Sequence, residues 1–78
     1  MRVDYDSEAD AAYVWLREDA DRAFGMDLDN RRYVDFSSDE VPIGIELLGV
    51  SLGVDTAGLP ARERVEVLLS QHDIRILP

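Results

Sequence analysis

The stretch that decides the fold is Tyr5–Leu16, YDSEADAAYVWL, which runs from an aromatic residue through an acidic segment into a β-favouring run. Asp and Ser side chains hydrogen-bond to nearby backbone amides and so favour turns. We therefore predict a structural turn held by Asp6, Glu8 and Asp10. Before the turn, polar and apolar residues alternate at the period of two that is typical of strands. After it, residues 11–16 are mostly apolar, and the same period would point them alternately to the two faces of a sheet. The stretch thus predicts an N-terminal β-hairpin.

Alternation continues along the rest of the first 48 residues. It predicts further strands at residues 23–28, 32–36 and 41–48, separated by polar turns. From Pro60 the pattern changes to a helical spacing, with apolar residues at Ala61, Val65, Leu68 and Leu69. We expect a helix from Pro60 to Ser70 and a short final strand over Ile74–Ile76.

These elements predict an α+β fold in one domain, residues 1–78. Residues 1–52 form an antiparallel β-meander of about five short strands, and residues 53–78 form a connector, an amphipathic helix and a tail. The helix packs on one face of the sheet, because this arrangement buries both apolar surfaces at once. That face is expected to collect Val3, Tyr5, Val14, Leu16, Phe24, Met26, Val34, Phe36, Ile45 and Leu47.

Composition narrows the possible functions. The 78 residues carry a formal charge of −9, with no cysteine and one histidine. An acidic surface repels phosphate backbones, so we expect no nucleic-acid partner. The same charge would attract a basic protein, which is the partner that the composition favours. The chain offers no thiolate zinc site and no apolar run long enough for a membrane span or a signal peptide. We expect a cytoplasmic protein with no cofactor.

Two blocks of sequence resemble the domain-of-unknown-function family 2283, a family of small prokaryotic proteins. The first is the pattern YD-x-EADA-x-YV-x-L over residues 5–16, and the second combines VDF at 34–36 with IGIELL at 43–48. Together they span about residues 1–52. The resemblance implies a small β-rich domain without a settled activity, and an antitoxin-type or partner-binding role beside small toxin-like proteins. Trp15 stands where the family commonly has a polar or charged residue.

No chemical motif is complete. The acids at alternate positions from Asp4 to Asp10 lack the glycine and the bidentate glutamate that a calcium-binding EF-hand loop requires. His72 has no nucleophile and orienting carboxylate on its own helix face. Glu46 is the one acid in a partly apolar setting, but a single carboxylate is not an active site.

Two functions remain. The first is a non-enzymatic, homo-oligomerising protein-interaction module, with an antitoxin-like role toward a small basic protein. The alternative is a small ligand- or metal-binding protein or enzyme that uses the Asp6–Asp10 turn or Glu46.

The sequence also predicts where association occurs. If Val14 and Leu16 face the helix, alternation puts Tyr13 and Trp15 on the opposite face, which one helix cannot cover as well. We expect an interface made by Tyr13, Trp15, Tyr33 and Leu48. A small domain without disulfides or metals often gains stability by oligomerising, so a second copy across a two-fold axis is the expected partner.

Overall fold

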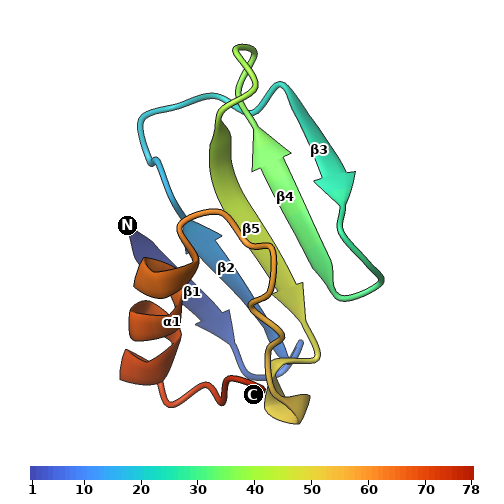
Figure 1. Ribbon diagram of the computed structural model, residues 1–78, viewed down its shortest axis with the longest axis vertical. Coiled ribbons are helices and arrows are strands. Elements are labelled where there is room, and N and C mark those ends of the chain that lie inside the picture. Colours follow the sequence, from blue (N-terminus) through green and yellow to red (C-terminus); the bar gives the residue numbers. More distant parts are fainter.

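The computed structural model describes residues 1–78 as one antiparallel sheet with a C-terminal helix (Figure 1). This confirms the predicted α+β class. The strands follow the predicted segments closely, and the helix begins two residues later than predicted. The bounds are β1 Arg2–Asp6, β2 Ala11–Trp15, β3 Phe24–Asp27, β4 Arg32–Phe36, β5 Pro42–Leu48, the 3-10 helix η1 Val50–Leu52 and the helix α1 Arg62–Gln71.

The strand order is β1-β2-β5-β4-β3, which places β5 at the centre of the sheet. Hairpins join β1 to β2 and β3 to β4 to β5, and β5 then pairs with β2. The register aligns Val14, Ile45 and Val34 across the three middle strands, and all three side chains are buried. The segment after β2 therefore carries the chain across to the far edge before β3 begins.

The core lies between the sheet and α1. Val65 and Leu69 of the helix are fully buried in the same cluster as Ile45 of β5. The connector between β5 and α1, expected only to link the two, also fills the core with Val50, Val54 and Leu59. In Figure 1 the connector and α1 cross in front of β1, β2 and β5 and leave β3 and β4 uncovered.

The set of helix residues that face the core differs from the prediction. Ala61 precedes the helix, is exposed and has a left-handed φ of 52°, and Leu68 is only half-buried. The two buried positions are one turn apart, Val65 and Leu69, since the helix starts at Arg62 and shares the core with the connector. The predicted final strand is reduced to a single parallel bridge between Ile76 and Val54, which keeps the tail on the helix side of the sheet.

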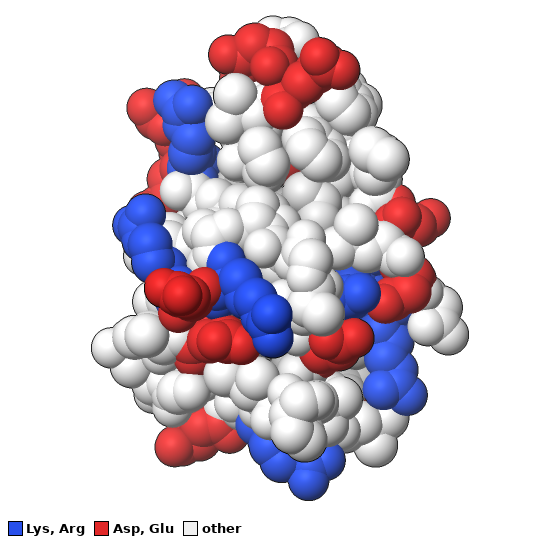
Figure 2. All heavy atoms as spheres, in the orientation of Figure 1, with Lys and Arg blue, Asp and Glu red and all other residues white.

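Part of the apolar face expected beneath the helix is open. Tyr5, Phe24 and Met26 were predicted to be covered, but 47%, 36% and 54% of their surface is exposed. The helix α1 lies against β1 at one side of the sheet, and a helix is only about 10–12 Å across, so it does not reach β3 at the far edge (Figure 1). Phe24 instead stacks on Phe36, with ring centroids 5.0 Å apart. Figure 2 shows the resulting uncharged area, bordered above by acidic residues and below by mixed charges.

No helix in the structure has the length and apolar character needed to cross a bilayer.

Candidate interaction face

The face of the sheet opposite α1 has no covering element, and its side chains form ordered rows. The register aligns one residue of each strand in a single row, in the order Asp4, Tyr13, Glu46, Tyr33, Asp27. Acidic and tyrosine side chains therefore alternate across all five strands. The two tyrosines are half-buried, and Glu46 and Asp27 are exposed. We call this set the acid–tyrosine row.

The neighbouring row makes room for the tyrosine rings. It contains Gly44 on β5 and Gly25 on β3, each one strand away from a tyrosine. A Cβ atom added at Gly44 would collide with the Tyr13 ring, and one added at Gly25 would collide with the Tyr33 ring. Each ring thus lies flat over the backbone of a glycine, which fixes its position on the face.

A buried carboxylate ties the two tyrosines together. Asp35 of β4 is only 9% exposed and lies between the rings. The Tyr13 hydroxyl donates to Asp35 Oδ2 at 2.6 Å, and Arg22 Nε donates to Asp35 Oδ1 at 2.7 Å. Arg22 Nη2 also donates to the Tyr33 hydroxyl at 2.9 Å. Sequence reasoning missed Asp35 and Arg22, because their meeting depends on the strand order and on the path of the loop after β2.

This network shifts two pKa values. Burial, and then the hydrogen bond to the Asp35 carboxylate, raise the pKa of Tyr13 well above its ordinary value. The same carboxylate raises the pKa of Arg22. Tyr13 is therefore a neutral hydrogen-bond donor and not a base at physiological pH.

Tyr13 should make the protein less stable in alkali. A pKa that is higher in the folded state than in the unfolded state contributes stability below the unfolded value, near 10, and that contribution is lost as pH rises above it. We expect the free energy of unfolding to fall above pH 10 (about the ordinary tyrosine pKa) and to fall less in Tyr13→Phe. Tyrosinate absorbance in native protein should lose its highest-pH component in that variant. Loss of a low-pH component instead would contradict the assignment.

Trp15 is held at the edge of the same face. Its indole Nε1 donates to Asp4 Oδ2 at 2.8 Å, and the Arg2 guanidinium lies 5.0 Å from its ring centroid. Its ring meets that of Tyr13 edge-on, with centroids 4.8 Å apart. Leu48, 42% exposed, lies on this face beside Ala11. Tyr13, Trp15, Tyr33 and Leu48 thus share one uncovered face, and their role in an interface stays a prediction.

The residues of the acidic turn bond within the chain. Asp6 Oδ1 accepts the backbone N–H groups of Glu8 and Ala9 at 3.0 and 3.1 Å, while the Glu8 side chain is exposed. Asp10 accepts from the backbone N–H and the hydroxyl of Ser51, at 2.9 and 2.7 Å, and so links the hairpin turn to η1. No three His, Asp or Glu side chains are grouped to hold a metal ion.

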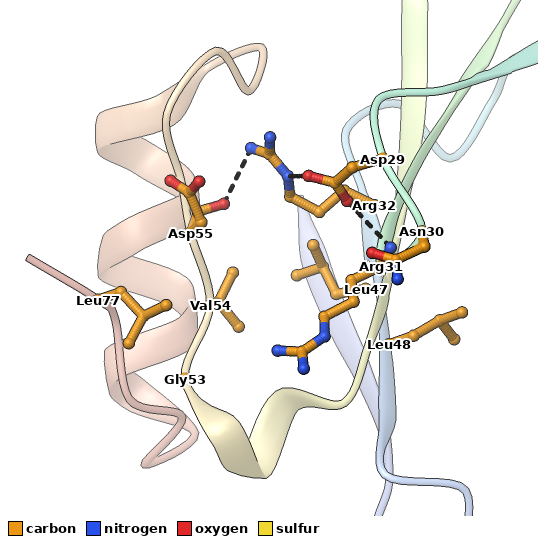
Figure 3. Close-up of a pocket in the computed structure, with 10 residues that line it drawn as sticks. All are labelled: Asp29, Asn30, Arg31, Arg32, Leu47, Leu48, Gly53, Val54, Asp55 and Leu77. Carbon is orange, nitrogen blue, oxygen red and sulfur yellow. Dashed lines mark hydrogen bonds and ion pairs between the residues drawn. The ribbon is translucent and has the colours of Figure 1, made fainter.

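A small pocket lies at the end of β5, between the β3–β4 turn and the connector (Figure 3). Its volume of about 130 Å³ is below the range of roughly 300–1,000 Å³ that is usual for ligand sites. Arg32 spans it, with Nε bound to Asp29 at 2.9 Å and Nη1 donating to the Asp55 carbonyl at 3.0 Å. The Arg31 backbone N–H and the Arg32 guanidinium lower the pKa of Asp29. These bonds join the turn to the connector, so the polar residues of the pocket have a structural role.

The fold and this face define a small α+β domain with one uncovered aromatic and acidic sheet face. The sequence model of the family described as "Protein of unknown function (DUF2283)" matches residues 2–51, and the chain belongs to this family. The match covers all five strands and ends within η1. No curated protein and no solved structure matches the chain.

Proposed function

We propose that this protein is a non-enzymatic protein-interaction module whose open sheet face binds a basic segment of another protein, in an antitoxin-like manner. The observation that carries the proposal is the acid–tyrosine row. Adjacent strands are about 4.8 Å apart, so the carboxylates of Asp4, Glu46 and Asp27 recur about every 10 Å. The rings of Tyr13 and Tyr33 lie beside them, over the glycines of the neighbouring row. Arginine and lysine side chains interact favourably with both kinds of group.

Two of these carboxylates are available to a partner. None of the ion pairs within the chain involves Glu46 or Asp27. The position of Arg2 over Trp15 illustrates how a guanidinium can pack on a ring of this face. The formal charge of −9 would also steer a basic partner toward the molecule and speed its association.

The same geometry favours a basic partner over a second copy on this face. A symmetric pairing of two acid–tyrosine rows would bring carboxylates close to carboxylates, which is unfavourable. An enzymatic use is less well supported, because Asp6 is occupied by backbone amides and Tyr13 by Asp35. Glu46 has no neighbouring nucleophile with which to act.

The test is a binding titration with a synthetic peptide of alternating arginine and alanine, followed by peptide anisotropy. Glu46→Gln should weaken binding by up to about fivefold, since an exposed ion pair contributes roughly 0.2–1 kcal/mol. Trp15 is the only tryptophan, so a change in its fluorescence locates the peptide on this face. Added salt should weaken the binding.

Glu63→Gln is the matched control, because Glu63 is an exposed acid on α1 and its loss changes the net charge equally. It should bind the peptide as the unaltered protein does. Equal weakening by both substitutions, or no change in Trp15 fluorescence, would show only a general attraction to an acidic protein and would refute the proposal.

A further inference from the structure

The strand β3 is an edge strand with free backbone groups. Leu28 donates its N–H to the Arg32 carbonyl at 2.8 Å, next to the paired residues Asp27 and Tyr33. Because antiparallel bonding alternates, Met26 also bonds to β4, and the N–H and C=O groups of Gly25 and Asp27 point away from the sheet. These groups form an unused hydrogen-bonding edge.

This edge also carries apolar side chains. Phe24, Met26 and Leu28 lie on the helix side of the sheet and are 36%, 54% and 42% exposed, beyond the reach of α1. Strand edges of this kind pair readily with other strands unless charges protect them. The opposite edge, β1, is protected in this way by Arg2, Asp4 and Asp6, whereas β3 has one charge, Asp27.

We propose that two copies of the chain pair through β3, antiparallel about a two-fold axis at Met26, so that one sheet continues across both copies. Met26 then lies opposite the partner's Met26, and Phe24 lies opposite the partner's Leu28. The outward groups of Gly25 and Asp27 bond to those of the partner's Asp27 and Gly25. Both helices lie on the same side, and the exposed apolar strips meet and bury part of their surface against each other.

Charge selects this register. With the axis at Met26, Asp27 faces the partner's Gly25, over which the partner's Tyr33 ring lies with Arg22 bonded to its hydroxyl. The carboxylate thus faces a hydroxyl and a guanidinium whose charge is shared with Asp35, and not a second free carboxylate. An axis at Asp27 would oppose two carboxylates, and an axis at Gly25 would leave Leu28 unpaired. The pairing does not rest on the proposed function. It engages Asp27 and Tyr33 at the β3 end of each acid–tyrosine row and leaves Glu46, Tyr13 and Asp4 of both copies free.

Cysteine cross-linking tests the pairing, because the chain has no cysteine of its own. Residues opposite each other at a non-hydrogen-bonded position have Cα atoms about 4.5 Å apart, within the range of about 4.4–6.8 Å that a disulfide spans. Met26→Cys should therefore form a covalent dimer under mild oxidation. Val67→Cys is the matched control, since Val67 is 58% exposed on α1. Equal cross-linking of the two variants would overturn the proposal.

The register has its own test. Phe24→Cys and Leu28→Cys should each cross-link poorly alone but efficiently when the two variants are mixed, because these positions face each other across the axis. Efficient cross-linking of either variant alone would refute this register.

Sedimentation of the unaltered chain gives a measurement that does not depend on cysteine variants. Two acidic copies repel, so added salt should favour the dimer, whereas salt should weaken the binding of a basic peptide. Met26→Lys should shift the protein to monomer and Val67→Lys should not. A chain that is monomeric at high micromolar concentration in high salt would overturn the pairing and leave the proposed function untouched.

Discussion

Leu69→Asp should unfold the domain. Leu69 is 0% exposed and lies in the core with Val65 and Ile45, which are also fully buried. Burying a carboxylate without a partner costs several kcal/mol, and a small domain has a total stability of about 5–15 kcal/mol. A chain of 78 residues buries a smaller share of its surface than a larger domain does, so it lies toward the low end of that range. Far-UV circular dichroism and urea unfolding would show the loss directly.

Val67→Asp is the control for this experiment. Val67 lies on the same helix, two residues earlier, and is 58% exposed. The introduced charge is the same, and the helix propensities of leucine and valine differ by less than about 0.7 kcal/mol, so the two variants differ mainly in burial. We expect Val67→Asp to stay within about 0.5 kcal/mol of the unaltered protein. If Leu69→Asp melted at the same temperature as Val67→Asp, α1 would not be packed on the sheet in solution.

The strands and their faces could be predicted from sequence because alternation is a local signal. Val14 and Ile45 occupy alternate positions that the pattern assigns to the helix side of the sheet, and both are buried as expected. Strand order is not local. The position of β5 between β2 and β4 follows from pairing across the whole sheet, and this order leaves β3 at an edge beyond the helix. The exposure of Phe24 and Met26 could not be read from their spacing for this reason.

The buried residues were harder to predict where α1 and the connector both contribute side chains to the core. The helical spacing treated Leu68 and Leu69 alike, but Leu68 is half-buried and Leu69 fully buried. The connector supplies Val50 and Val54 to the space beside the helix, and this decides which helix positions turn inward. These residues are spaced too irregularly, among glycines, to give a periodic signal.

The sequence predicted which aromatic residues share the open face, but it did not predict the hydrogen bonds that connect them. Alternation places Tyr13 and Trp15 together, but the bond from Tyr13 to Asp35 joins residues 22 apart across an intervening strand. Arg22 comes from a loop that has no regular pattern. The only sequence signal for this arrangement is a pair of strand glycines, Gly25 and Gly44, which mark places where a bulky group approaches the backbone closely.

Gly44→Val should therefore be the most damaging substitution on the open face. Gly44 has ordinary strand geometry, so the reason for glycine is space: an added Cβ collides with the Tyr13 ring. The ring must leave, and the hydrogen bond from its hydroxyl to Asp35 is lost. Overpacking costs about 1–3 kcal/mol and a lost hydrogen bond about 1 kcal/mol, so we expect a loss of roughly 2–4 kcal/mol in urea unfolding.

A double-mutant cycle separates this cause from a general intolerance of side chains at the centre of β5. In a Tyr13→Ala background the ring is absent, and valine is a better strand former than glycine. Gly44→Val should then cost much less than in the unaltered protein, because the two residues are in contact and their effects are coupled. Equal cost in both backgrounds would mean that the backbone of the sheet, not the Tyr13 ring, requires glycine. The ring would then not be positioned by Gly44, and the acid–tyrosine row would lose the constraint that holds it ready for a partner.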